Sequence, residues 1–62
     1  MKFPYGVFNT KTKEWVRNDE GFIFRTYDYF EARIAVERLE DLKSLNPLWK
    51  DYQYEILEQT QG

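Results

Sequence analysis

Hydrophobic and polar residues alternate along the first half of this chain in the way that is typical of β-strands. Residues 3–8, 14–17 and 22–26 are rich in aromatic and β-branched side chains, and polar residues that favour turns separate them. Such segments favour extended structure. Gly21, at the end of the second polar stretch, accepts a positive φ without steric cost. The pattern predicts three strands, of which the first two form a hairpin.

Residues 28–45 change to the period of a helix. Their apolar side chains fall within a sector of about 120° at 100° per residue, and they are Ala32, Ala35, Val36, Leu39 and Leu42. Asp28 followed by Glu31 has the spacing of a capping box, with Thr26 as the alternative cap. The helix should end at Asn46, because a residue before proline avoids the α region.

Residues 52–58 alternate again and predict a last strand. The order strand, strand, strand, helix, strand indicates an α+β fold, with a small and largely antiparallel sheet and a single helix packed on one face. The last strand pairs either parallel to the third strand, through a right-handed crossover, or with the first strand. The sequence leaves both possibilities open. Residues 1–62 are predicted to form a single domain, with a frayed tail over residues 59–62.

One helix covers one face of a sheet, so the strand period divides the apolar residues between two faces. The helix-facing set is predicted to be Val7, Val16, Phe22, Phe24, Tyr54 and Ile56. The uncovered face then carries Phe8, Trp15, Ile23 and Leu57. Monomers rarely expose so much apolar surface. Three interpretations follow: an interface with a partner or second copy, a platform for nucleic acid, or cover by sheet twist and the long loop.

A second apolar patch lies on the predicted helix. Phe30 and Ile34 are four residues apart and lie outside the main apolar sector. They either pack against Tyr27 or the first strand, or they form a contact ridge for a partner. Both residues therefore join the candidate partner-binding set.

The composition removes most catalytic chemistry. Five Phe, five Tyr and two Trp provide packing material, whereas the chain has no His and no Cys. Disulfides and a conventional zinc site are therefore excluded. Ser44, the only serine, has no histidine base for a triad. We predict a protein that is not an enzyme and needs no cofactor or metal.

The charge is unevenly distributed. Residues 1–27 carry five basic and three acidic side chains, whereas residues 28–62 carry four basic and eight acidic ones. This asymmetry fits head-to-tail association or a basic half that faces an anion. Basic side chains interleaved with aromatic ones favour single-stranded nucleic acid, and the candidates here are Lys11, Lys13, Trp15, Arg17 and Arg25. The net charge of −2 disfavours this alternative, because affinity depends on neutralising phosphates.

The segment from Trp15 to Leu42 contains Gly21-Phe22-x-Phe24-x-Thr26, followed by Glu31-Ala32 and then by Glu37 and Leu39. In these features it resembles the AP2-like, arm-type DNA-binding domains of phage and transposon integrases. The resemblance implies a three-stranded sheet that enters the major groove. It also implies a role for the chain as an accessory protein of a phage or mobile element, with DNA contacts at Trp15, Arg17 and Arg25.

We therefore expect a small protein-interaction module that self-associates through the open sheet face. The alternative is a nucleic-acid-binding module that uses the hairpin and the third strand. The lack of Cys fits a reducing cytosol, and no apolar run approaches the roughly 20 residues of a membrane span. These features predict a cytoplasmic protein without a membrane partner.

Overall fold

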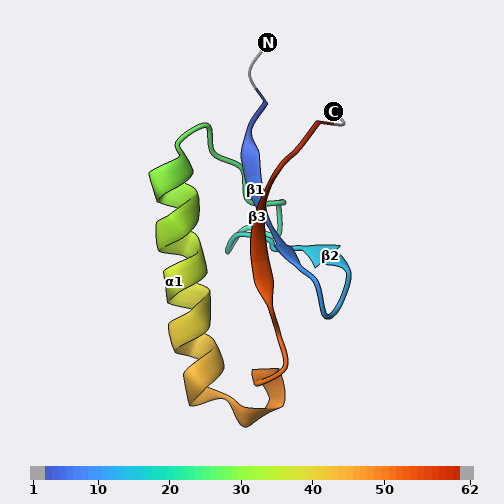
Figure 1. Cartoon of the computed structure of the whole chain (residues 1–62), viewed down its shortest axis with the longest axis vertical. Helices are drawn as coiled ribbons and strands as arrows, with labels where there is room; N and C mark the ends of the chain where they lie inside the picture. The colour runs from blue at the N-terminus through green and yellow to red at the C-terminus, as the bar shows by residue number, and fades with distance from the viewer. Residues whose placement is uncertain (1–2, 61–62) are drawn as a thin grey trace.

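The computed structural model describes residues 3–60 of the chain. Its elements are β1 (Tyr5–Asn9), β2 (Glu14–Trp15), α1 (Tyr29–Leu45), a short 3-10 turn (Pro47–Trp49) and β3 (Tyr54–Glu58). Figure 1 shows α1 beside a sheet whose strand order is β2-β1-β3, with both pairings antiparallel. The predicted α+β class is confirmed. Of the two pairings that the sequence left open, the last strand adopts the one with the first strand.

β1 is the central strand, and different segments occupy its two edges. On one edge β3 pairs along its whole length, with Val7 opposite Ile56. On the other edge β2 pairs only near the end of β1, where Phe8 lies opposite Trp15. Thr26 takes the place beside Tyr5 and exchanges two backbone hydrogen bonds with it, of 2.6 and 3.0 Å. On this edge β1 is thus shared between β2, which follows it directly in the chain, and Thr26, which lies farther along the sequence.

The predicted third strand is present only as an irregular segment. Ile23 forms an isolated bridge with Arg17, and Thr26 forms another with Tyr5. The Phe24 amide still donates to the Val16 carbonyl over 3.0 Å, but two residues later the chain pairs with β1 instead. A segment that changes partner within four residues cannot form a regular ladder, which explains why the predicted strand is broken.

The predicted start of the helix is confirmed, with Asp28 as the N-cap and Thr26 as a support for the cap residue. The Asp28 carboxylate accepts a hydrogen bond of 2.9 Å from the Phe30 amide, as an N-cap residue does. The Thr26 hydroxyl accepts from the Asp28 amide and donates to the Glu31 carboxylate. These contacts tie the first turn of α1 to the residue that pairs with β1. The helix ends at Asn46, directly before Pro47, as predicted.

The fully buried apolar core of the described residues is small. It consists of Val7 and Ala32, each 0% exposed. α1 lies over β1 and β3 and does not reach β2, so it covers only part of its face of the sheet. The prediction of Phe22 as a helix-facing core residue is wrong, because its side chain is 67% exposed. Phe24, two residues later, is half-buried on the side of α1.

The C-terminal end of the described chain is held in place. Gln59 is buried, and its backbone amide donates to the Pro4 carbonyl over 2.8 Å. The tail predicted to fray begins at this residue. Its last two positions, 61 and 62, lie outside the described residues.

Candidate protein-interaction surface

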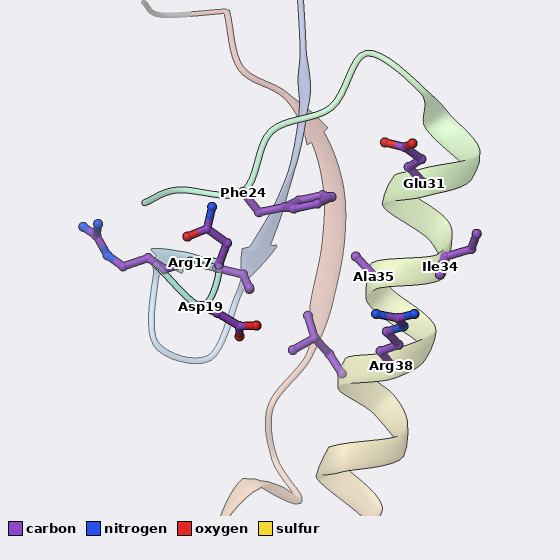
Figure 2. A pocket seen from close by; sticks show the side chains of 10 residues that line it. Arg17, Asp19, Phe24, Glu31, Ile34, Ala35 and Arg38 are labelled. Carbon is purple, nitrogen blue, oxygen red and sulfur yellow. The ribbon is translucent and has the colours of Figure 1, made fainter. Parts of the chain in front are cut away.

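A groove of about 500 Å³ separates α1 from the segment of residues 16–24 (Figure 2). It exists because α1 lies over β1 and β3 and leaves the β2 side of the sheet uncovered. The floor is apolar and consists of Val16, Phe24, Ala35 and Leu39, and Ile34 lines the outer edge with its side chain directed away from Phe24. The rim carries both signs of charge, from Arg17, Asp19, Glu31 and Arg38. Figure 2 shows the Phe24 ring pointing across this groove toward α1.

The outer face of α1, on the side away from the sheet, holds the most exposed apolar side chains of the helix. Phe30 is 76% exposed, Ile34 51% and Leu45 80%, and Leu48 in the following turn is 86% exposed. Phe30 makes one aromatic contact, an edge-on approach of 6.5 Å between its ring centroid and that of Tyr29. Phe30 therefore does not pack into the core. We call Phe30, Ile34, Leu45 and Leu48 the outer helix face.

The open sheet face is more completely covered than the outer helix face. Phe8 and Trp15 are half-buried and pack edge-to-face, with ring centroids 5.2 Å apart. A Cβ atom at Gly6 would overlap Gln59 Nε2 and lie 2.9 Å from Trp15 Cζ3. The Gln59 side chain and the Trp15 ring therefore close over the backbone at this position. Gln59 Nε2 also donates to the Phe24 carbonyl over 3.3 Å, which links this cover to the irregular segment.

The other two residues predicted on the open sheet face are Leu57 and Ile23. Leu57 pairs with Gly6, and its side chain is 39% exposed. Ile23 is half-buried and lines a shallow depression with Arg17, Phe22 and Arg25. The structure thus unites Phe8 with Trp15 and places Ile23 opposite Arg17 in the irregular segment.

The five candidate nucleic-acid residues lie in three places. Arg17 and Arg25 line the same depression, and the Arg17 guanidinium donates to the Gly21 carbonyl over 2.7 Å. Lys11 and Lys13 lie in the exposed turn between β1 and β2. Trp15 packs edge-to-face with Phe8. No single basic groove collects the described members of this set.

Tyr54, on β3, is a titratable residue whose pKa is shifted. Burial, followed by the neighbouring charges of Tyr52 and Glu40, raises the pKa of the Tyr54 phenol above its usual 10.0. This phenol is therefore neutral at pH 7 and remains a hydrogen-bond donor. Among the described residues, 3–60, no cluster of three or more acidic side chains is arranged to hold a metal ion, and no helix combines the length and apolar character needed to cross a bilayer.

Comparison with family models, curated proteins and solved structures gives no match for this chain. The resemblance to arm-type DNA-binding domains therefore stays a prediction. The surface itself is only partly foreseen by the sequence, which identifies Phe30 and Ile34 but not Leu45 or Leu48. A signal for Leu45 is present, because it follows Ile34 at a spacing of eleven residues, which is three helical turns.

Proposed function

We propose that this chain is a non-enzymatic protein-interaction module that binds a protein through the outer helix face and the adjoining groove. The observation that carries the proposal is the exposure of Phe30 and Leu45, which exceeds three quarters for each side chain. Full burial of such a side chain contributes about 1.5–3 kcal/mol. Covering both side chains with a partner therefore adds a favourable hydrophobic contribution to the free energy of binding.

The scaffold beneath this surface is preorganised. The Asp28 cap and the Thr26–Glu31 hydrogen bond fix the first turn of α1, and Phe30 lies within that turn. A rigid helix loses little conformational entropy when it binds, so more of the contact energy appears as affinity. The outer helix face thus has the rigidity expected of a helix that presents apolar anchors to a partner.

The groove adds a neighbouring site of different character. Ile34 belongs to both surfaces, because it lines the groove and is half exposed on the outer helix face. The Ala35 methyl leaves space between α1 and the Phe24 ring (Figure 2). An apolar side chain of a partner fits this floor, and the charged rim offers hydrogen bonds around it. Apolar centres with polar rims are the usual anatomy of protein interfaces.

Site-specific photo-crosslinking in the cells that express the chain tests this function. A benzophenone amino acid replaces Phe30 or Leu45 on the outer helix face, Leu57 on the open sheet face, or Arg33 on an exposed polar part of α1. We expect discrete protein adducts from the first two positions and none from Arg33. Adducts from Leu57 alone would move the interface to the sheet. Equal labelling at all four positions would contradict a defined interface.

The nucleic-acid alternative has one observation in its favour. Arg17 and Arg25 meet the exposed Phe22 ring at one depression, and guanidinium groups beside an aromatic ring suit an unstacked base. If this surface binds nucleic acid, short single-stranded DNA or RNA at low salt should shift the amide signals of residues 15–17 and 22–26. Unchanged signals in those segments would exclude it.

A further inference from the structure

Four residues of α1 form a narrow seam along the helix. Ile34, Arg38, Asp41 and Leu45 follow one another at spacings of four, three and four residues. At 100° per residue they fall within a sector of about 60°, on the side opposite the buried Ala32. All four side chains are exposed. We call this set the helix seam, and its spacing is that of the contact positions of paired helices.

The helix seam is complementary to itself in one orientation. Ile34 and Leu45 are equally distant from its centre, and so are Arg38 and Asp41. When two copies of α1 align antiparallel about that centre, Ile34 of each copy meets Leu45 of the other. Arg38 of each copy meets Asp41 of the other. The pairing thus contains two apolar contacts at its ends and two opposite-charge contacts in its middle.

We infer that the partner of the outer helix face is a second copy of this chain, docked antiparallel along α1. Charge selects this orientation, because a parallel alignment places Arg38 against Arg38 and Asp41 against Asp41 of the other copy. Within residues 3–60 the only ion pair joins Lys43 to Glu40. Arg38 and Asp41 are therefore available for contacts between copies.

The exposed side chains beyond the helix seam extend the contact. Phe30 lies before its first residue and Leu48 after its last, so the antiparallel pairing brings Phe30 of each copy near Leu48 of the other. The charged pairs at the centre fix register and orientation, whereas the apolar contacts supply most of the affinity. A two-fold pairing of this kind closes on itself, so it yields a dimer and not a filament.

The size of the contact sets the expected strength. α1 has 17 residues, which corresponds to a length of about 26 Å. A single pair of such helices buries less surface than the roughly 1,200 Å² at the lower end of stable interfaces, so we expect dissociation at roughly tens to hundreds of micromolar. This inference rests on the proposed interaction function and adds to it the identity of the partner.

Sedimentation equilibrium of charge-exchanged variants tests the inference. Arg38→Asp places two acidic side chains opposite each other at both central contacts, and Asp41→Arg places two basic ones there. We expect each variant alone to dimerise at least about tenfold more weakly than the native chain. An equimolar mixture of the two should form a heterodimer, because every central contact is then between opposite charges. The double variant Arg38→Asp/Asp41→Arg should recover the native dimer.

Arg33→Asp is the matched control, because it makes the same charge change on an exposed part of α1 outside the helix seam. It should dimerise as the native chain does, and thermal unfolding should show that all variants fold. If the native chain stays monomeric up to about 1 mM while crosslinks still form at Phe30 and Leu45, the inference is overturned and the interaction function stands. A native chain that neither dimerises nor forms crosslinks at Phe30 and Leu45 would overturn both the inference and the interaction function. A native dimer that responds equally to Arg38→Asp and Arg33→Asp would also overturn the inference.

Discussion

The open sheet face and the outer helix face start from similar apolar side chains but are covered to different extents. On the sheet, Trp15 packs edge-to-face against Phe8, and Gln59 lies across Gly6. On the helix, Phe30 and Leu45 remain exposed. The sheet face is covered by a residue more than fifty positions away from Gly6 along the chain, whereas no described segment crosses the outer face of α1 (Figure 1). Apolar surface therefore indicates binding only where the rest of the chain fails to reach it.

The largest difference between the two faces should appear when each loses an aromatic ring. Trp15→Ala removes a half-buried ring together with its contacts to Phe8 and Gln59, so we expect a loss of about 2–3 kcal/mol in the free energy of unfolding. Phe30→Ala removes an exposed ring and should change that free energy by no more than about 0.5 kcal/mol in the monomer. Urea titration at low concentration measures both. Equal losses would remove the distinction between the faces.

Gly6→Ala tests how tightly the sheet face is closed. The added Cβ meets Gln59 Nε2 and Trp15 Cζ3, so one of these side chains must move. We expect a loss of about 1–2 kcal/mol from overpacking in a chemical denaturation experiment. The double variant Gly6→Ala/Gln59→Ala, which provides space, should lose less than the sum of its single variants. Full additivity would show that Gln59 does not cover Gly6.

Lys13→Gly should stabilise the sheet side. Lys13 has a φ of 64° in the turn between β1 and β2, a conformation that L-residues adopt at a cost and glycine adopts readily. Glycine also raises the entropy of the unfolded chain, which offsets part of this benefit. We expect a net gain of about 0.5–1 kcal/mol in the free energy of unfolding. Lys11→Gly makes the same change of residue type without a positive φ, and it should not stabilise. A loss for Lys13→Gly would show that the turn is unstrained.

The smallest effect concerns alkaline pH and the strand beneath α1. The pKa of Tyr54 is raised in the folded chain, chiefly by burial. The folded state therefore holds this proton more tightly than the unfolded state does. The resulting stability is fully present below pH 10.0, the ordinary pKa, and is lost as pH rises through the folded value. Tyr54→Phe should reduce the fall in melting temperature above that pH, and Tyr27→Phe, at an exposed ring, should not.

The sequence predicts the features of this fold that depend on neighbours along the chain. Asp28, Thr26 and Pro47 mark the ends of α1 because capping and proline sterics act within a few residues. The burial of Val7 and the pairing of Phe8 with Trp15 on the opposite face follow from alternation along β1.

Features that depend on distant segments are not visible in the sequence. The irregular segment passes from Arg17, which follows β2, to Tyr5 of β1, a change of partner that no local pattern of residues 22–26 reveals. Phe22, which was predicted to face α1, lies in the bend beside Gly21 and is 67% exposed. Of the candidate surface, Phe30 and Ile34 are predictable from helical spacing, whereas the groove requires knowledge of how far α1 reaches across the sheet.

The most direct test of the contrast between the two faces is a dilution series of the native chain followed by amide chemical shifts. Concentration-dependent shifts should concentrate at the outer helix face and the helix seam, around Ile34, Arg38 and Leu45. Signals of Phe8 and Trp15 should stay constant, because their side chains are already covered within one chain. The account would be contradicted if the signals of Phe8 and Trp15 shifted while those of α1 stayed constant, or if no signal shifted.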